Sequence, residues 1–229
     1  MNLPDREFYC TVRTTTYRRA KMAFFPERYI MGADKYLDAY VEELTIAWRS
    51  VSREAMRTAE ILLANTVATD STIFSCGNGG SAAISNHLLC DCLKGVQAGT
   101  KLKPRVHSLS STPELITAIA NDIGVEEIFS LPLRSLGRTG DVLIAISSSG
   151  ASPNIVSAVR TAKALGMKVI GLTGFDGGHT AIEADISLHV TANNYGVIED
   201  VHQSLMHVLA QSLRMGALIS HTDLGRIRF

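Results

Sequence analysis

The pattern of hydrophobic and polar positions divides the chain into a helical first part and a longer part in which two periods alternate. Between residues 34 and 63, apolar side chains recur at spacings of three and four, which predicts helix. A helical stretch of this length exceeds what one globular face usually needs. Two interpretations are therefore open. The stretch forms one long helix that packs on a partner subunit, or it forms two helices that fold onto the main domain. Residues 1–33 show no such period and are expected to form an irregular N-terminal arm.

From residue 71 onward, short apolar segments alternate with amphipathic stretches. The short segments predict strands at 71–76, 105–109, 141–146, 168–173 and 185–190. The amphipathic stretches predict helices at 82–93, 113–120, 125–136, 153–165 and 197–219. Two segments, LIAIS and KVIGLT, are nearly continuous apolar runs, as in parallel strands that are buried on both faces. The alternation predicts an α/β fold, a doubly wound parallel five-stranded sheet with helices on both faces, preceded by an N-terminal helical extension.

Length and composition fit one domain with a helical attachment. We expect a single domain over residues 34–220 and a C-terminal tail at 221–229. The hydrophobic fraction of 46% is enough for a sizeable core, and 22 Lys and Arg balance 22 Asp and Glu. A net charge of zero argues against binding to nucleic acid by bulk electrostatics and favours self-association.

Three further features bear on the compartment. The sequence contains no run of eighteen apolar residues, so no membrane span is expected. The first residues lack the apolar stretch of a secretory signal, and a cytoplasmic location is expected. The four cysteines, Cys10, Cys76, Cys90 and Cys92, are interpreted as reduced thiols rather than as a disulfide framework or a thiol metal site.

Two loops that follow predicted strands carry unusual residues. The sequence GNGGS at 77–81 opens directly into a helix, which Ser81 is expected to cap. The sequence SSSGASP at 147–153 offers four hydroxyl groups, and its proline suits the first helical position. Ligands of open α/β sheets bind beyond the carboxyl ends of the strands. Neither loop matches the Walker or the dinucleotide pattern, so the two loops together predict a small phosphorylated ligand, with ordinary connecting turns as the alternative.

Ionisable side chains gather in two helical segments. His87 and Asp91 lie four residues apart, on one helical face, and Glu199, His202 and His207 lie around the start of the last helix. Imidazoles and carboxylates suit zinc or a similar divalent cation, and they equally suit proton transfer. Glu199 and His207 are about 12 Å apart along an ideal helix. A shared metal would therefore require a bent or pre-helical Glu199, or ligands from two chains. His202 is interpreted as a surface or packed imidazole.

Four segments of the sequence carry a family resemblance. They are CGNGGSAAISNH, AIANDIGVEEIFS, GDVLIAISSSGASPNIVSAVRTAKALGMKVIGLTGFDGG and IEDVHQSLMH. In this order and spacing they resemble the sugar isomerase (SIS) domain superfamily, and within it the phosphoheptose isomerases. The resemblance implies a flavodoxin-like sheet and a homotetramer with active sites at subunit interfaces. It also implies an aldose–ketose isomerase that converts sedoheptulose 7-phosphate to a heptose 7-phosphate by enediol(ate) proton transfer.

The resemblance also implies roles for individual residues. The phosphate-holding positions fall on Ser147, Ser148, Ser149 and Ser152. The other substrate-contact positions fall on Asn78, Gly79, Gly80, Ser81, Asn121, Asp122 and Glu199. The metal and acid/base positions, with Zn²⁺ as the expected cofactor, fall on His87, Asp91, Glu199 and His207. Among these, Asp91 is the candidate base and His207 the candidate acid.

The chain departs from the family pattern at two of these places and at one further position in the serine loop. Asp91 stands where the family usually has Glu, Glu199 where it usually has Gln, and Ala151 where it usually has Asn. Two alternatives therefore stay open, a non-catalytic sugar-phosphate sensor or protein-binding regulator, and an isomerase of a different phosphosugar. The presence of His87, His207 and a carboxylate at position 91 favours an enzyme.

Overall fold

The computed structural model describes residues 32–218. The predicted tail, and the predicted arm apart from residues 32 and 33, lie outside the described residues. The chain divides into two compact units, residues 1–39 and 40–229, and the architecture below is that of the second unit. Within the described part, none of the helices has the length and apolar character needed to cross a membrane.

A five-stranded, all-parallel sheet forms the centre of the second unit, in the order β2-β1-β3-β4-β5. The strands are β1 (Thr72–Gly77), β2 (Arg105–Ser108), β3 (Val142–Ser147), β4 (Lys168–Thr173) and β5 (Ile186–His189). This is the strand order of flavodoxin-like folds, and it confirms the predicted fold class. Because β1 and β3 are neighbours, the loops that follow them leave the same edge of the sheet side by side.

Eight α-helices connect and flank these strands in the described residues. They are α1 (Ala33–Ser50), α2 (Arg53–Ala68), α3 (Gly80–Cys90), α4 (Pro113–Asp122), α5 (Ser130–Leu136), α6 (Pro153–Ala164), α7 (Gly178–Glu183) and α8 (Tyr195–Ala217). Two short turns complete them, the π-helical η2 (Asp91–Val96) and the 3₁₀ η3 (Val125–Glu127). The first predicted helical region forms two helices, because Ser52 caps the second one by accepting a hydrogen bond from the Ala55 amide at 3.2 Å.

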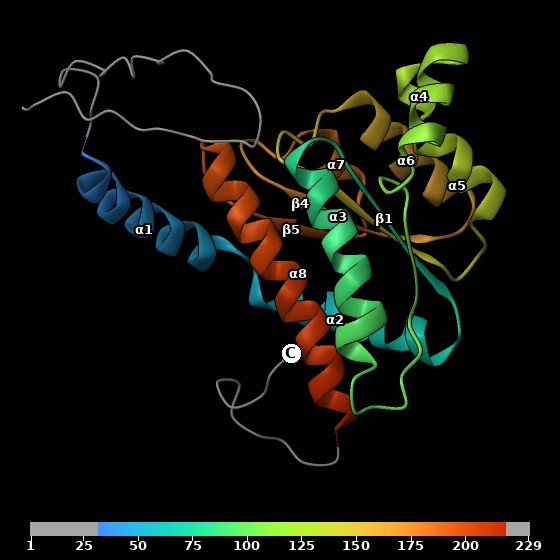
Figure 1. Cartoon of the computed structure of the whole chain (residues 1–229), viewed down its shortest axis with the longest axis horizontal. Coiled ribbons are helices and arrows are strands. Elements are labelled where there is room, and N and C mark those ends of the chain that lie inside the picture. Colours follow the sequence, from blue (N-terminus) through green and yellow to red (C-terminus); the bar gives the residue numbers. More distant parts are fainter. Residues whose placement is uncertain (1–31, 219–229) are drawn as a thin grey trace, which may run out of the picture. The chain divides into compact units, whose positions relative to one another are not determined.

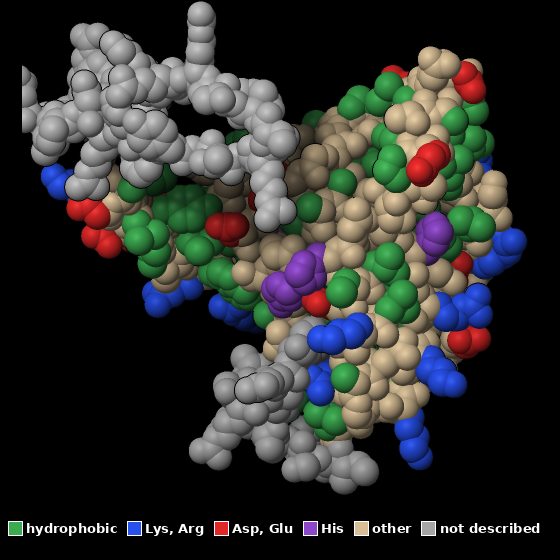
Figure 2. All heavy atoms as spheres, viewed as in Figure 1, with side chains coloured by type: hydrophobic (Ala, Val, Ile, Leu, Met, Phe, Trp, Pro, Cys, Tyr) green, Lys and Arg blue, Asp and Glu red, His purple; other side chains and the backbone are tan. Residues whose placement is uncertain are grey.

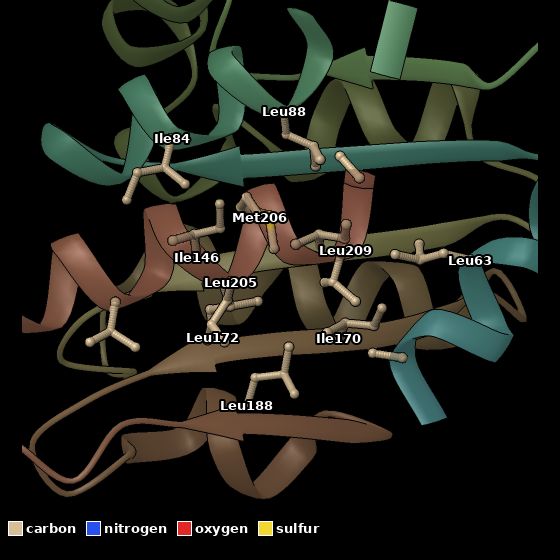
Figure 3. Close-up of a cluster of buried hydrophobic side chains, with 14 of the residues drawn as sticks. Leu63, Ile84, Leu88, Ile146, Ile170, Leu172, Leu188, Leu205, Met206 and Leu209 are labelled. Carbon is tan, nitrogen blue, oxygen red and sulfur yellow. The ribbon is translucent and has the colours of Figure 1, made fainter. Parts of the chain in front are cut away.

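Two hydrophobic layers enclose the sheet. Successive side chains of a strand point to opposite faces, so Ile144 and Ile146 of β3 lie in one layer, and Leu143 and Ala145 in the other. The first layer, drawn in Figure 3, packs the sheet against α2, α3 and α8. The second layer packs it against α4, α5 and α6. The arrangement of these elements can be followed in Figure 1, where α3 and α8 run beside each other. The site described below lies on these two helices and on the loops that follow β1 and β3.

Three details of the helices differ from the sequence-based expectations. Ser81 does not cap α3, because the helix already begins at Gly80 and Ser81 is its buried second residue. The helix predicted at 125–136 is divided into η3 and α5, since Pro132 lacks an amide hydrogen and is accommodated only near the start of a new helix. Helix α7 was not expected, because its six residues are too few for a helical period to be visible.

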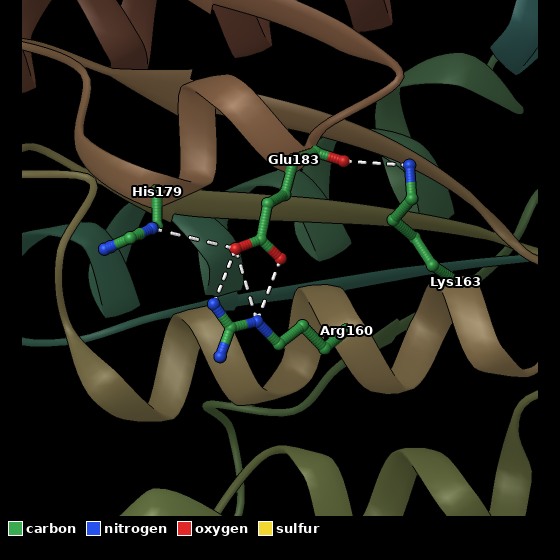
Figure 4. A network of polar contacts seen from close by, with 4 residues as sticks. All are labelled: Arg160, Lys163, His179 and Glu183. Atoms are coloured by element: carbon green, nitrogen blue, oxygen red, sulfur yellow. Dashed lines mark hydrogen bonds and ion pairs between the residues drawn. The ribbon is translucent and has the colours of Figure 1, made fainter.

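A polar network attaches α7 to α6 and thereby fixes the segment after β4 (Figure 4). Arg160 donates three hydrogen bonds to the carboxylate of Glu183, from Nη2 at 2.7 Å and from Nε at 2.9 and 3.2 Å. These bonds lower the pKa of Glu183, while Lys163 donates to its backbone carbonyl. The His179 ring lies 3.8 Å from the same carboxylate. Helix α6 follows the serine loop and α7 follows the loop after β4, so the network joins the two helices into which these loops lead.

Candidate functional site

The loops after β1 and β3 enclose a recess at the carboxyl edge of the sheet. Its volume is about 130 Å³, and it is lined by Asn78, Ser81, Ile146, Ser147, Ser148, Ser149, Ser152, Tyr195 and Glu199. A water molecule occupies about 30 Å³, so the recess has room for about four waters or a group of similar size. All four serines of the predicted phosphate loop are among the lining residues. The recess therefore brings together the two loops that the sequence singled out.

Hydroxyl and amide groups dominate this recess, and none of its lining residues is Lys or Arg. Ser147 Oγ accepts a hydrogen bond from the Gly150 amide at 3.1 Å, and Ser149 Oγ accepts one from the Ala151 amide at 3.3 Å. The hydroxyl of Ser148 is buried and has no hydrogen-bond partner among residues 32–218. A buried hydroxyl without a partner costs free energy, so this group is suited to a ligand oxygen.

A pair of asparagines holds the two loops together. Asn78 Nδ2 donates to Asn154 Oδ1 at 2.9 Å, and Asn154 Nδ2 donates back to Asn78 Oδ1 at 3.0 Å. Asn154 lies in the first turn of α6 and is only 5% exposed. The loop after β1 and the helix after the serine loop are thus joined by two hydrogen bonds.

The backbone of the serine loop also rests directly on the segment that follows β4. Gly150 has a φ of +63°, and a Cβ atom at this position would overlap the carbonyl of Gly177. The Gly150 carbonyl accepts a hydrogen bond from the Thr180 amide at 2.9 Å, and the Ser148 carbonyl accepts one from the Gly174 amide at 2.8 Å. Only glycine combines this backbone conformation with so close an approach of two chains.

Glu199 lines the recess from the opposite side. It lies within the helix α8, so of the two ways in which Glu199 could share a metal with His207, only a site with ligands from two chains stays open. Its carboxylate lies against Gly80 at the start of α3, where a Cβ atom would overlap it. A carboxylate is favoured near the amino end of a helix, because the free amides there carry partial positive charge. The sequence GNGGS leaves room for this contact, since a larger residue than glycine at position 80 would exclude the carboxylate.

A second group of polar side chains lies farther along α3 and α8. His207 Nδ1 is 2.9 Å from Asp91 Oδ2, and His87 Nε2 is 3.4 Å from Asp91 Oδ1. The two imidazole rings meet edge to face, with centroids 4.9 Å apart. Asp91 is 7% exposed, whereas both histidines reach the surface. In Figure 2, histidine side chains gather beside an acidic side chain where α3 and α8 run in Figure 1.

The backbone at Asp91 departs from a regular helix. Helix α3 ends at Cys90, and a π-helical turn begins at Asp91 and continues to Val96. Such a widened turn inside a helix often occurs at functional positions. It packs against α8, and there the side chain of Asp91 lies between His87 of its own helix and His207 of α8.

The His87, Asp91 and His207 group fits a divalent metal ion. One ligand atom from each side chain lies within 4.8 Å of the others. Two imidazoles and one carboxylate are a donor set that zinc enzymes use. Glu199, the fourth residue of the expected set, is not in this group and instead contacts Gly80. The thiol of Cys92, next to Asp91 in the sequence, is no substitute, because burial raises its pKa to about 12 and keeps it protonated.

Asn121 and Asp122, which were expected in the site, lie away from the recess, whereas Gln203, which was not expected, lies beside His207. Asn121 and Asp122 lie at the exposed end of α4, where the Asn121 amide donates to Asp122 at 2.7 Å, and they do not line the recess. Gln203 was not singled out from the sequence. Its side-chain nitrogen lies 3.1 Å from His207 Nε2. The signal that could have revealed it is its spacing, four residues after Glu199 and four before His207.

His202 is fully buried, so it is a packed imidazole and not part of the site. Its Nε2 lies 3.2 Å from the Thr173 carbonyl, and its Nδ1 has no partner in the described residues. Burial lowers the pKa of His202 from 6.5 to about 4.

This shift in the pKa of His202 predicts a pH-dependent stability. Between pH 6.5 and pH 4 the unfolded chain binds a proton at this residue that the folded chain excludes, so stability falls as the pH falls through this range. The free energy of unfolding of the wild type should therefore fall by roughly 3 kcal/mol more than that of His202→Gln between pH 6.5 and pH 4, since each pKa unit corresponds to about 1.4 kcal/mol. Urea unfolding of both proteins at a series of pH values measures the difference. Parallel curves would contradict it.

Comparison with known proteins places this geometry in a family. Residues 35–174 match the SIS domain family. A phosphoheptose isomerase from Pectobacterium atrosepticum is 38% identical over 159 residues, which cover 69% of this chain and 81% of the relative. One from Proteus mirabilis is 36% identical over 185 residues, covering 77% and 95%. The structure of phosphoheptose isomerase from Neisseria gonorrhoeae superposes with a TM-score of 0.73 at 33% identity, covering 79% of this chain and 98% of that one.

The doubly wound sheet, the serine loop and this match together define the class. The chain belongs to the SIS domain family. It is an isomerase that resembles the phosphoheptose isomerases.

Proposed function

We propose that the protein is an aldose–ketose isomerase of sugar phosphates that interconverts sedoheptulose 7-phosphate and a heptose 7-phosphate. The observation that carries this proposal is the pairing of an anion-suited recess with a His–Asp–His group on the same two helices. The similarity to phosphoheptose isomerases supports it.

The spacing of the two groups supports a long substrate. Glu199 at the recess and His207 in the second group lie eight residues apart on α8, about 12 Å along the helix. Eight bonds separate the phosphorus from C1 of a heptose 7-phosphate, and an extended chain advances about 1.2 Å per bond. The substrate would span about 10 Å, whereas a triose phosphate would span about half of that.

In the proposed binding mode the phosphate lies among Ser147, Ser148, Ser149 and Ser152. Hydroxyl and amide donors can surround an anion without a lysine. The opposite loop, after β1, is formed by Asn78, Gly79, Gly80 and Ser81. We expect these residues and Glu199 to contact the sugar. Binding energy at the phosphate then holds C1 and C2 near the second group.

The reaction needs one group that removes the proton from the carbon next to the carbonyl and one that protonates the enediol(ate) oxygen. We assign the first role to Asp91 and the second to His207. Asp91 Oδ2 and His207 Nδ1 are 2.9 Å apart. A Zn²⁺ or similar ion held by His87, Asp91 and His207 would polarise the carbonyl and stabilise the enediolate. A carboxylate that binds a metal is a weaker base, so the two uses of Asp91 compete.

The proposal also includes self-association. Val41 and Ile46 of α1, Ile61 of α2 and Val208 of α8 are apolar side chains between 42% and 55% exposed. Apolar exposure of this kind favours a homo-oligomer, with the tetramer as the proposed state. Asn121 and Asp122, which are exposed and away from the recess of their own chain, would then contact substrate in a neighbouring subunit. The expected cytoplasmic location stays a prediction.

The decisive experiment is an NMR assay of the purified full chain with sedoheptulose 7-phosphate, combined with analysis of its metal content. Conversion to an aldose, with exchange of the C1–C2 proton for solvent deuterium, is the expected result. Five- and six-carbon ketose phosphates are tested in parallel. Faster conversion of one of these would show that the substrate is a different phosphosugar. A protein that binds these compounds without converting any of them would be a sensor instead.

The unpartnered hydroxyl of Ser148 gives a further prediction. A hydrogen bond to a charged phosphate contributes about 1.5–3 kcal/mol, so Ser148→Ala is expected to raise KM about 10- to 100-fold. The contact is the same in ground and transition states, and kcat should change little. The matched control is Ser157→Ala on α6, which does not line the recess. Unchanged KM values in the Ser148 variant would remove this hydroxyl from the phosphate site.

A further inference from the structure

Tyr195 lines the recess but has no part in the proposed binding mode. It is the first residue of α8, where the side chain of Asn194 caps the helix by accepting a hydrogen bond from the Val197 amide at 3.3 Å. Glu199 follows Tyr195 by four residues, so both side chains lie on one face of α8, and both line the recess. His207 lies about two turns beyond Glu199 along the same helix. Tyr195 therefore lies at the end of the recess that faces away from His207.

The ring of Phe175, in the loop after β4, supports the ring of Tyr195. The two rings meet edge to face, with centroids 4.7 Å apart. Phe175 packs against the hydrophobic layer of α2, α3 and α8, and it does not itself line the recess. Its φ of +49° is strained for a bulky residue, and its amide donates to the Ala192 carbonyl at 3.1 Å. Such strain persists only where the surrounding contacts impose it, and it is typical of ligand sites.

The size of the recess fits a terminal phosphate. Its volume of about 130 Å³ holds about four waters, and a phosphate group is of similar size. In the proposed binding mode the carbon chain leaves the recess toward His207, so the other phosphate oxygens lie among the serines and Tyr195. A second ester group on the phosphorus would extend toward the tyrosine ring. Because Tyr195 is 59% exposed, removal of its ring would open this end of the recess to solvent.

We propose that Tyr195 is a specificity-determining residue that closes the recess behind the phosphate, so that monoesters enter and diesters do not. This inference rests on the proposed function of the recess in phosphate binding. Phe175 is a positioning residue that acts through Tyr195. A steric wall of this kind rejects the wrong ligand without adding affinity for the right one.

The test compares ethyl phosphate, a monoester, with diethyl phosphate, a diester, in ³¹P NMR titrations of the full-length protein. Tyr195→Ala removes the ring, and its affinity for diethyl phosphate is expected to rise about 10-fold or more, as the steric conflict is relieved. Its affinity for ethyl phosphate should stay within about twofold of the wild type, since the ring adds no attraction. The matched control Tyr195→Phe keeps the ring and should reject the diester as the wild type does.

Two further variants locate the effect. Ser148→Ala should weaken the binding of ethyl phosphate, because the probe then loses a hydrogen bond inside the recess. Phe175→Leu keeps an apolar side chain but loses the aromatic contact, so its affinity for diethyl phosphate should rise about 2- to 10-fold, the range of one aromatic pair. In the Tyr195→Ala background the same substitution should have no effect. A purely structural role of Phe175 would change binding in both backgrounds.

An unchanged affinity of Tyr195→Ala for diethyl phosphate would overturn the proposal, and so would a gain of diester binding in Tyr195→Phe. None of these titrations requires turnover. A protein that binds ethyl phosphate but converts no sugar phosphate would therefore contradict the isomerase function and leave the test of Tyr195 intact. A wild type that binds neither ester, or binds ethyl phosphate independently of Ser148, would contradict both the phosphate site and the role of Tyr195.

Discussion

Replacing Asp91 with asparagine is expected to lower kcat by about a thousandfold. General acid–base groups contribute about 10²- to 10⁴-fold, and this carboxylate is in contact with both histidines of the group. Asparagine has nearly the same shape and can still accept a hydrogen bond from His207, so the buried site stays filled. The substitution removes the negative charge, which both proposed uses of Asp91 require. Steady-state kinetics with the sugar phosphate substrate measure the loss.

The control for Asp91→Asn is Asp70→Asn. The side chain of Asp70 is 77% exposed and pairs with Arg105 on the surface. Its φ of +58° is tolerated by asparagine, so the substitution should leave activity and folding unchanged. The thermal unfolding midpoint and the mass in solution of Asp91→Asn should match those of the wild type. A rate within a few-fold of wild type for Asp91→Asn would exclude this carboxylate from the mechanism.

Replacing Gly150 with alanine is expected to reduce the free energy of unfolding by about 3–5 kcal/mol. The left-handed conformation alone costs about 1–2 kcal/mol for a residue with a Cβ atom. At Gly150 the added atom also meets the backbone of Gly177, which cannot move without breaking the hydrogen bond between the Thr180 amide and the Gly150 carbonyl. The serine loop and its neighbour would have to separate, so phosphate affinity should fall as well.

The matched control for Gly150→Ala is Gly99→Ala. Gly99 has a similar φ of +75°, but the atom nearest to the position of its Cβ is Leu218 Cδ2 at 3.8 Å, an ordinary contact. This variant should lose only the conformational share, about 1–2 kcal/mol. Urea unfolding of both variants isolates the cost of the backbone collision as their difference. Equal losses would show that the two loops are not tightly apposed.

The sheet could be predicted from sequence because its strands are buried on both faces. Continuous apolar runs such as Val142–Ser147 have no other stable environment in a chain with this pattern of helices. The serine loop could be predicted for a related reason, since hydroxyls and glycine at the end of such a strand are exposed at the edge of the sheet. Pro153 is at the first helical position, as expected.

Tertiary contacts determined what the sequence could not show. The π-helical turn at Asp91 has no local signal, because it depends on packing against α8. Glu199 was grouped with His207 by residue type, although its carboxylate is accommodated by a glycine more than a hundred residues earlier in the chain. Gln203 was overlooked because an amide is an ordinary residue on a helix surface until a partner is seen beside it.

The reciprocal amide pair of Asn78 and Asn154 has a consequence for the thermodynamics of ligand capture. Two loops that are already tied to each other lose little conformational entropy when a ligand enters between them. Most of the intrinsic attraction of the serine hydroxyls then appears as affinity instead of being spent on ordering the chain. In the proposed binding mode, a small, uncharged set of donors thereby retains a phosphate that more mobile loops would hold only with added positive charge.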